Sequence, residues 1–298
     1  PSLQADMVVL AIGVTPDTAL AKEAGLELGI KGSIVVNDRM ETSVPDIYAA
    51  GDAVQVKHYV TGDDALISLA GPANKQGRII ADNICGGDSR YLGSQGSSVI
   101  KVFDITAATT GINENNAKKA GLEVDTVILS PMSHAGYYPG GKVMTMKVVF
   151  EKETYRLLGA QIIGYEGVDK RIDVLATAIH AGLKATQLKD LDLAYAPPYS
   201  SAKDPVNMAG FMIDNIAKGT LKQWHLEDMD KISKDKSVVL LDVRTVGEFN
   251  RGHMDGFKNI PVDELRERIN EIEKGKPVYL ICQSGLRSYI ASRILEGN

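Results

Sequence analysis

Apolar runs, broken by glycine and proline, divide the first third of the chain into short strands and two helices. The longest apolar run, Met7–Ile12, is predicted to be a buried strand, and a loop follows at Gly13–Pro16. Four further elements are expected: helices over 18–24 and 72–84, and strands around 34–36 and 47–50. Pro72 suits the first position of the second helix, where a missing N–H is tolerated, and Gly86 and Gly87 suit its end. This pattern predicts α/β structure.

The pattern changes from about residue 93, where strands outnumber helices. Strands are expected over 98–104, 124–129, 142–150 and 157–163, and helices over 114–120 and 169–181. In the second helix Ile172, Leu175 and Ile179 share one face. Gly182 ends this helix, and Asp169 is suited to cap it. The segment is therefore predicted to be an α+β domain.

The C-terminal part of the chain alternates strands and helices. Strands are expected over 238–243 and 278–282, and helices over 262–273 and 284–295. Such alternation predicts a parallel sheet, hence a second α/β domain. The chain is accordingly divided into four segments, at residues 1–50, 51–92, 93–217 and 218–298.

Composition narrows the class of protein. A chain of 298 residues with 44% hydrophobic and 24% charged residues is long enough for two or three globular domains. The net charge of −5 argues against a nucleic-acid partner, and Met7–Ile12 is too short to span a membrane. Two distant cysteines, Cys85 and Cys282, provide neither a disulfide framework nor a metal site. Such cysteine usage suits a reducing cytoplasm.

A twelve-residue string, Thr42–Ala53, carries the first candidate binding site. Its apolar part delivers Gly51 and Asp52 at the C-terminal end of a strand, where ligands sit in open α/β sheets. Glycine lets a ligand approach the backbone, and a carboxylate accepts hydrogen bonds from sugar hydroxyls. The helix beginning at Pro72 adds free N–H groups and a positive dipole end. A lone Gly-Asp pair would equally make a simple turn, so the interpretation depends on the whole string.

That string resembles the second FAD fingerprint of the pyridine-nucleotide disulfide reductase family. The resemblance implies that Asp52 holds the ribityl chain and that residues 70–73 lie near the pyrimidine edge of the flavin. Val9–Pro16 similarly resembles the closing strand of the family's NAD domain, although any buried strand before a glycine turn would look alike. The cofactor-binding residues expected on this basis are Gly13, Gly51, Asp52, Ala53, Leu69, Ala70, Gly71, Pro72 and Ala73.

The α+β segment resembles the dimerisation domain of the same family through Thr109–Glu114, where Asn113 is a helix cap, and Ala117–Gly121. A homodimer is therefore implied. Tyrosines cluster on two proline- and glycine-rich stretches. In coenzyme A-disulfide reductases, tyrosines of this domain reach the partner subunit's active site. Tyr137 and Tyr195 match best, with Tyr138 and Tyr199 as alternatives. Half-buried packing is the simpler role for any of the four.

The absence of a His-Pro dipeptide followed by glutamate favours the branch of the family in which one cysteine works with coenzyme A. Cys85 lies at a helix end and is expected to be structural. His134 is expected to be an exposed loop histidine.

A second cysteine motif lies near the C-terminus. Cys282 ends a strand and opens the sequence Cys-x-x-Gly-x-Arg, which leads into a helix. Backbone N–H groups at such a helix start stabilise a thiolate, and Arg287 adds positive charge. With the upstream Asp242-Val243-Arg244, the motif resembles a rhodanese-like sulfurtransferase. Asp242 and Arg244 are expected to brace the loop, whereas Cys282 carries a persulfide.

The resemblance covers about half of a reductase–rhodanese fusion. No Gly-x-Gly-x-x-Gly fingerprint occurs in the chain, so weak or no FAD binding is expected, and the rhodanese-like domain is expected to be incomplete. The implied parent enzyme uses NAD(P)H and FAD to reduce coenzyme A disulfide, coenzyme A persulfide or polysulfide, with Cys282 relaying sulfane sulfur. An NADH oxidase on the same scaffold and an inactive dimerising sulfur carrier stay open as alternatives. NADH and NADPH are not distinguished.

Overall fold

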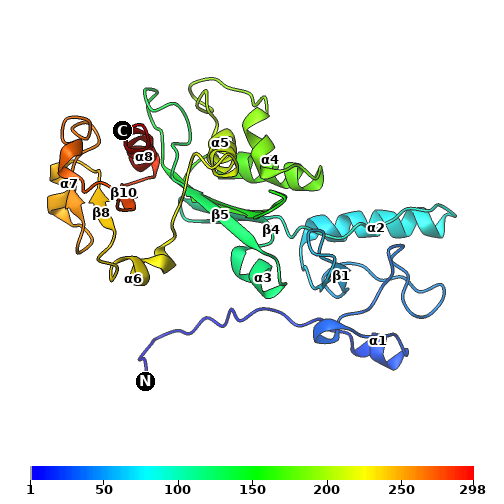
Figure 1. The fold of residues 1–298 in the computed structure, drawn as a ribbon. Helices are drawn as coiled ribbons and strands as arrows, with labels where there is room; N and C mark the ends of the chain where they lie inside the picture. The colour runs from blue at the N-terminus through cyan, green and yellow to red at the C-terminus, as the bar shows by residue number, and fades with distance from the viewer. Residues whose placement is uncertain (1) are drawn as a thin grey trace. The chain divides into compact units, whose positions relative to one another are not determined.

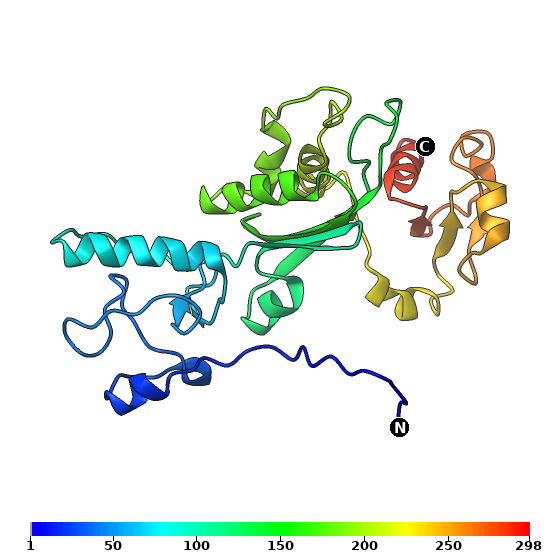
Figure 2. The ribbon, with the colours of Figure 1, turned by 180° about the vertical axis from the view of Figure 1, so that it is seen from behind.

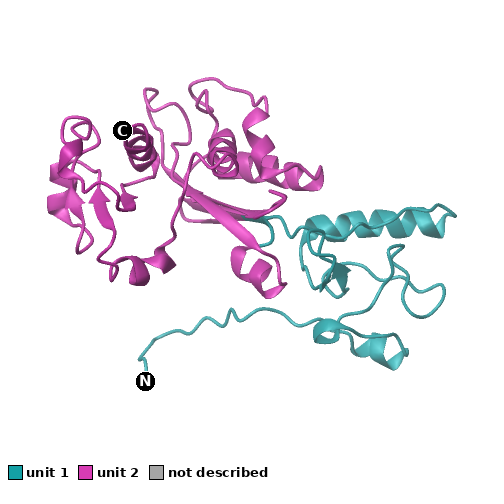
Figure 3. Cartoon of the chain, in the orientation of Figure 1, with its two compact units in different colours: residues 1–98, 109–112 teal, residues 99–108, 113–298 magenta. Residues whose placement is uncertain are grey.

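The computed structural model describes residues 2–298, which fold into two compact units (Figure 3). The first runs to residue 98 and includes residues 109–112, and the second contains the remainder. No helix among the described residues is long and apolar enough to cross a membrane.

The first unit is built around one long helix (Figure 1). Its elements are α1 (Ala19–Glu23), η1 (Ile30–Gly32), β1 (Val56–Lys57), β2 (Asp64–Ala65) and α2 (Ala70–Ile84). A small core of Met40, Val54 and Val56 packs against one face of α2 through Ile79 and Ile80. The helix starts two residues earlier than predicted, so Pro72 is its third residue. No intrahelical bond is lost there, because the first four N–H groups of a helix have no intrahelical acceptor.

Three strand predictions in this unit are wrong. Met7–Ile12 is not a strand: its side chains are about 80% exposed, and no strand of the described residues pairs with it. An apolar run becomes a strand only where neighbours satisfy its N–H and C=O groups. The segments around 34–36 and 47–50 contribute only isolated bridges, Ile34 to Leu28 and Val54, and Tyr48 to Glu41.

The second unit contains a five-stranded sheet in the order β3-β4-β7-β6-β5. The strands are β3 (Ser98–Val102), β4 (Ile105–Gly111), β5 (Val124–Leu129), β6 (Met144–Glu151) and β7 (Leu157–Gly164). β5, β6 and β7 pair antiparallel, and parts of β5 and β6 alternate buried with more exposed residues, as is common in antiparallel sheets. The four strands predicted here are confirmed to within a few residues. β4 was not predicted, because its sequence ITAATTG has few large apolar side chains.

Helices cover this sheet, as Figures 1 and 2 show from opposite sides. They are α3 (Glu114–Lys119), α4 (Val168–His180), η2 (Ala185–Asp190) and α5 (Pro205–Ala217). α4 packs on β7, whereas α5 packs on β5 and η2. Asn113 caps α3 as predicted, by accepting a 2.9 Å bond from the Asn116 N–H. The predicted cap of α4 is wrong: Gly167 holds that position, in a left-handed conformation, and Asp169 lies inside the helix.

The predicted parallel sheet is confirmed in the C-terminal part of this unit, where the strand order is β10-β8-β9. Its elements are η3 (Leu226–Asp228), α6 (Met229–Ile232), β8 (Val239–Asp242), α7 (Val246–Arg251), β9 (Lys258–Asn259), η4 (Ile269–Glu271), β10 (Val278–Ile281) and α8 (Leu286–Glu296). The predicted helix over 262–273 is wrong. Val262, Leu265 and Ile272 have helical spacing, but they reach the core from successive turns and the short η4.

The segment that leads from the five-stranded sheet domain to this parallel sheet, around Gln223 and His225, is held against β5 by a polar cluster. The His225 Nε2 lies 2.9 Å from Asp125 Oδ1 on β5, and Gln223 donates to the same oxygen at 3.1 Å. A hydrogen bond with Asp125 raises the pKa of His225, against the effect of its burial, and Asp228 and Glu227 add negative charge. Burial of Asp125 disfavours its ionised form, but bonds from His225, the Thr126 N–H and Gln223 outweigh burial and lower its pKa.

This cluster predicts a pH-dependent stability. Because the pKa of His225 is raised, its pairing with Asp125 stabilises the folded state fully below about pH 6.5, the pKa in the unfolded chain. That stabilisation is lost as pH rises through the folded-state pKa. Because the pKa of Asp125 is lowered, its ionised form stabilises the folded state above about pH 4, and this stabilisation is lost in acid. We expect His225→Ala to lower the urea midpoint most near pH 5.5 and least near pH 8.5, with Trp224 fluorescence as the signal. A pH-independent difference would contradict the ionic pairing.

Candidate functional site

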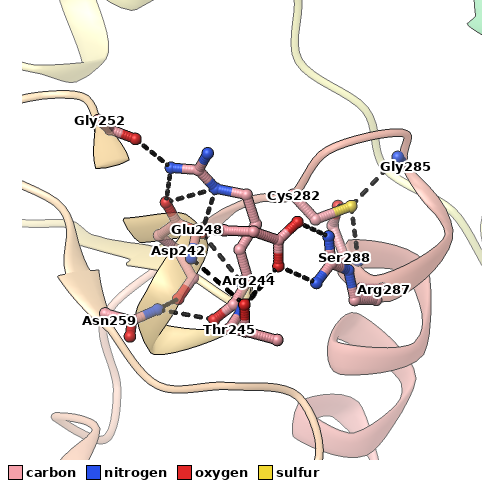
Figure 4. Close-up of polar contacts among 10 residues, drawn as sticks. All are labelled: Asp242, Arg244, Thr245, Glu248, Gly252, Asn259, Cys282, Gly285, Arg287 and Ser288. Carbon is pink, nitrogen blue, oxygen red and sulfur yellow. Dashed lines mark hydrogen bonds and ion pairs between the residues drawn. The ribbon is translucent and has the colours of Figure 1, made fainter. Parts of the chain in front are cut away.

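Cys282 lies between the end of β10 and the start of α8, within a tight loop (Figure 4). Its Sγ accepts hydrogen bonds from the Gly285 N–H at 3.1 Å, the Ser288 N–H at 3.4 Å and the Ser288 hydroxyl at 2.9 Å. Gly285 has φ +94°, a conformation that glycine adopts without strain. The loop therefore turns its donors toward one sulfur atom.

These donors change the acidity of the thiol. Burial disfavours the thiolate, but the Ser288 hydroxyl and the N–H groups of Ser288, Ser284 and Gly285 outweigh burial and lower the pKa of Cys282. Hydrogen bonds to a charged form favour that form. The site is suited to a nucleophilic thiolate, and the same donors suit the terminal sulfur of a persulfide.

Arg287, the second residue of α8, lies beside this loop, but its positive charge is paired. Its two terminal nitrogens donate to the two carboxylate oxygens of Glu248 at 2.7 Å each. Glu248 is itself fixed by α7, where it forms a capping box with Thr245. The bonds from Arg287 and then Thr245 hold the pKa of Glu248 far below its usual range. Arg287 is thus a paired cation beside Cys282 rather than the free positive charge that the sequence suggested.

Asp242 and Arg244 brace this site, as expected. Asp242 is fully buried, and its carboxylate accepts bonds from the Arg244 side chain at 2.6–3.0 Å. Arg244 also donates to the Gly252 carbonyl at 2.9 Å, and Asn259 donates to the carbonyls of Asp242 and Arg244. The brace joins β8 to α7 and β9, the segments beside the cysteine loop.

Two loops of the second unit, one carrying Tyr137 and the other Tyr195, lie side by side and are called the tyrosine loops below. The hydroxyl oxygens of Tyr137 and Tyr195 lie 2.8 Å apart, although the residues are 58 positions apart in sequence. Tyr137 is 77% exposed and Tyr195 is 45% exposed. The hydrogen bond with Tyr137, with burial second, raises the pKa of Tyr195. Of the four candidate tyrosines, the pair favoured from sequence is the one whose hydroxyls are in contact.

The alternative tyrosines lie beside this pair. Tyr138 packs edge-on against His134, with ring centroids 5.6 Å apart, and Tyr199 is largely exposed. His134 is only 5% exposed, so the prediction of an exposed loop histidine is wrong. Glycine at 141 leaves room for its ring, since a Cβ there would lie 3.2 Å from His134 Cε1. A pocket of about 590 Å³, lined by Tyr195, Tyr199, His134 and Lys170, opens here.

The residues predicted from sequence to bind the flavin, apart from Gly13, gather at the start of α2. Gly51 has φ +87° with free space around it, and its N–H donates to the buried Gln76 Oε1 at 2.7 Å. Asp52 exposes its carboxylate, and Ala53 follows directly. The N-cap of α2, Leu69, provides no side-chain cap, so the N–H groups of Ala70 and Gly71 keep their donor capacity beside Pro72 and Ala73. This combination fits a ligand that carries hydroxyls and negative charge. No described hydrogen bond ties Gly13 to the group.

Sequence reasoning missed three residues that shape these sites. Glu248 pairs with Arg287, Ser288 donates to Cys282, and Gln76 anchors Gly51. A Thr-x-x-Glu capping box was visible for Glu248. Ser288 lies only six residues after Cys282, so its proximity was visible in the sequence, whereas no local signal marked Gln76 as the partner of Gly51.

Three family models match the chain. The pyridine nucleotide-disulphide oxidoreductase model matches residues 1–77, its dimerisation domain matches residues 97–205, and the rhodanese-like domain matches residues 225–297.

Similar proteins combine the same parts. The chain is 40% identical over 203 residues to the NAD(P)H sulfur oxidoreductase (CoA-dependent) of Pyrococcus furiosus, covering 68% of the chain and 46% of that protein. The structure resembles reduced Bacillus anthracis CoADR-RHD, with a TM-score of 0.95 and 49% identity, over 99% of this chain and 53% of the other. It also resembles a NAD-dependent persulfide reductase from A. fulgidus, with a TM-score of 0.90 and 43% identity, over 99% and 53%. The chain thus spans about half the length of these relatives.

Proposed function

We propose that this chain, which belongs to the pyridine nucleotide-disulphide oxidoreductase family and carries a rhodanese-like domain, transfers sulfane sulfur on Cys282 within a coenzyme A disulfide or persulfide reductase. The observation that carries the proposal is the hydrogen-bonded Cys282 sulfur, which has donors from Gly285 and Ser288. Similarity to a CoA-dependent sulfur oxidoreductase and to a persulfide reductase supports the substrate class.

The sulfur-transfer step follows from this geometry. The Cys282 thiolate attacks the outer sulfur of a donor such as thiosulfate, the S–S bond of the donor breaks, and sulfite leaves with its electron pair. The product is a Cys–S–S⁻ group whose negative charge moves outward by one sulfur. The Gly285 and Ser288 donors stabilise the thiolate before attack and the persulfide afterwards. An acceptor nucleophile then takes the outer sulfur and restores the thiolate.

The Tyr137–Tyr195 pair supports the reductase half of the proposal. The chain would act as a homodimer through its dimerisation domain, and the exposed hydroxyls would then face a partner's thiol site. Because each hydroxyl both donates and accepts, the pair would hold a proton at the sulfur of a coenzyme A thiol and return it. We keep Tyr138 and Tyr199, which lie beside the pair, as secondary candidates.

The flavin-side residues support FAD as the cofactor of the parent enzyme. Asp52 would accept a hydrogen bond from a ribityl hydroxyl, and the uncapped start of α2 would stabilise negative charge near Ala70–Ala73. When bound, FAD would accept electrons from NAD(P)H and pass them to the thiol site. Gln76 would keep the Gly51 backbone in place for its close approach.

Two alternatives share parts of this evidence. An NADH oxidase on the same scaffold has no use for the Cys282 loop, so the sulfur-binding geometry favours the reductase. A sulfur carrier without reductase activity would need neither the tyrosine pair nor the start of α2. A reducing cytoplasm suits both free cysteines.

Replacement of Ser288 tests the proposed function through the acidity of Cys282. Ser288→Ala removes the 2.9 Å hydroxyl bond, so the thiol pKa is expected to rise. A lost bond to a charged group is worth about 1.5 kcal/mol, which lowers the acid dissociation constant of the thiol roughly tenfold. We expect wild-type protein to transfer sulfur from thiosulfate to cyanide. The pH profiles of this activity and of iodoacetamide alkylation should both move to higher pH in the variant.

The matched control is Ser292→Ala, in the same helix, whose hydroxyl bonds to the Tyr289 carbonyl instead. It should leave both pH profiles in place. Absence of sulfur transfer by folded wild-type protein would refute the proposed function.

A further inference from the structure

Both tyrosine loops are attached to one buried guanidinium. Arg171, on α4, is only 1% exposed. Its Nη2 donates to the Ser133 carbonyl at 3.0 Å, on the loop that carries Tyr137. The same nitrogen donates to the Tyr199 carbonyl at 3.4 Å, on the loop that carries Tyr195. One side chain therefore contacts the backbones of two loops that are distant in sequence.

A buried carboxylate fixes the position of this guanidinium. Asp204 is 3% exposed, and its Oδ2 accepts from Arg171 Nη2 at 2.9 Å and Nε at 3.2 Å. The fully buried Ser200 hydroxyl donates to the same Oδ2 at 2.6 Å and lies 3.0 Å from Arg171 Nη2. The other oxygen of Asp204 accepts from the Val206 N–H and caps α5. The cation is thus tied to the helices that flank both loops.

The backbone leaves space for this arrangement. Arg171 Nη1 donates to the Gly167 carbonyl at 3.2 Å, and a Cβ on Gly167 would lie 2.1 Å from Nη1. A direct bond also joins the loops, from the Ala135 N–H to the Ser200 carbonyl at 2.9 Å. Every main-chain contact of the guanidinium is therefore to a loop or to the start of its own helix.

The exposed hydroxyl pair needs such support. Tyr137 is largely exposed and Tyr195 is partly exposed, so water can replace the partner of either phenol at little cost. Holding two such side chains at 2.8 Å costs side-chain and loop entropy unless their backbones are already in place. The pocket beside Tyr195 includes Arg171 in its wall, so Arg171 and Tyr195 line the same cavity.

We propose that Arg171, with Asp204 and Ser200, is a positioning residue that sets the two tyrosine loops so that Tyr137 and Tyr195 act as one hydroxyl pair. Its importance for turnover rests on the proposed function of the pair. The planar fork of arginine is essential to this role. While Nη2 contacts both loop carbonyls, Nε bonds Asp204 and Nη1 bonds the Gly167 carbonyl, and lysine, with one nitrogen, cannot make all three sets of contacts.

The test follows the titration of Tyr195 by NMR in the full chain, labelled at tyrosine Cζ. Tyr195→Phe identifies its signal among the 11 tyrosines. Tyr137→Phe defines the titration of an uncoupled Tyr195, whose pKa should fall toward its ordinary value. Arg171→Lys keeps the charge beside Asp204 but removes the fork, and we expect it to move the Tyr195 titration to the Tyr137→Phe position.

Lys189→Gln is the matched control, because it removes a cation whose described side-chain bond is to Asp214 on α5 rather than to either tyrosine loop. Its Tyr195 titration should equal that of wild type. If Arg171→Lys does not fold, Ser200→Ala removes one contact of the same cluster and is expected to shift Tyr195 in the same direction.

An unchanged Tyr195 titration in a folded Arg171→Lys or Ser200→Ala protein would overturn the proposal, as would an unchanged titration in Tyr137→Phe. These measurements require no turnover. The proposed function of the pair fails separately, if Tyr137→Phe and Tyr195→Phe leave reduction of coenzyme A disulfide unchanged in a reductase that contains this chain.

Discussion

Cys282→Ser is expected to abolish sulfur transfer from thiosulfate to cyanide, a loss on the order of 10³-fold or more. A serine hydroxyl is not ionised near neutral pH and cannot carry a persulfide. The loop donors from Gly285 and Ser288 cannot compensate, because they stabilise charge on a sulfur that is no longer present. Thiocyanate formation, followed over time with thiosulfate and cyanide, measures the effect.

The chain provides its own control for this experiment. Cys85, the other cysteine, is exposed at the end of α2, with no ring of donors like that around Cys282. Cys85→Ser should keep full transfer activity. Activity that persists in Cys282→Ser and disappears in Cys85→Ser would reverse the assignment of the sulfur-carrying residue.

Arg244→Met is expected to lower the free energy of unfolding of the parallel-sheet region by about 3–5 kcal/mol, the second large effect. Asp242 is fully buried, and Arg244 is the cation that donates to both of its oxygens. Removing that partner leaves a buried carboxylate without its countercharge, which costs far more than the lost contact alone. Methionine keeps most of the side-chain volume, so the effect reports the charge.

Trp224 is a selective probe for this unfolding, because it is the only tryptophan and its Nε1 donates to the Leu280 carbonyl on β10 at 3.1 Å. Urea titration followed by its fluorescence should show a lower midpoint for Arg244→Met. Arg268→Met serves as the comparison, since Arg268 bonds only exposed carboxylates, those of Glu264 and Glu271. Equal urea midpoints for the two variants would show that the buried Arg244–Asp242 pair stabilises the fold no more than the exposed ion pairs of Arg268.

Local signals in the sequence predict much of the fold. β5 begins and ends where its apolar pattern predicted, and Asn113 caps α3. The strand that leads to Cys282 was also located from its apolar run. α5 was missed, although Asp204 and Pro205 are a recognisable helix start, since its core resembles any apolar stretch.

The sequence predictions failed where the backbone conformation of a segment depends on segments that pack beside it. Met7–Ile12 has the composition of a buried strand, yet a strand forms only beside a paired partner. The segment over 262–273 has helical spacing, but tertiary packing uses the same apolar side chains from turns. Periodicity reports which residues are buried, and it does not report the backbone path that buries them.

The sequence by itself determined the chemistry of the cysteine loop, because every donor to the Cys282 sulfur lies within six residues of it. Only the tertiary structure decided which charges and hydroxyls meet. Glu248 neutralises Arg287 across 39 positions, and Tyr137 reaches Tyr195 across 58. Arg171 joins those tyrosine loops from a helix between them in sequence. Such contacts depend on how helices pack on a sheet, and that packing is the sum of many apolar contacts rather than a property of any short motif.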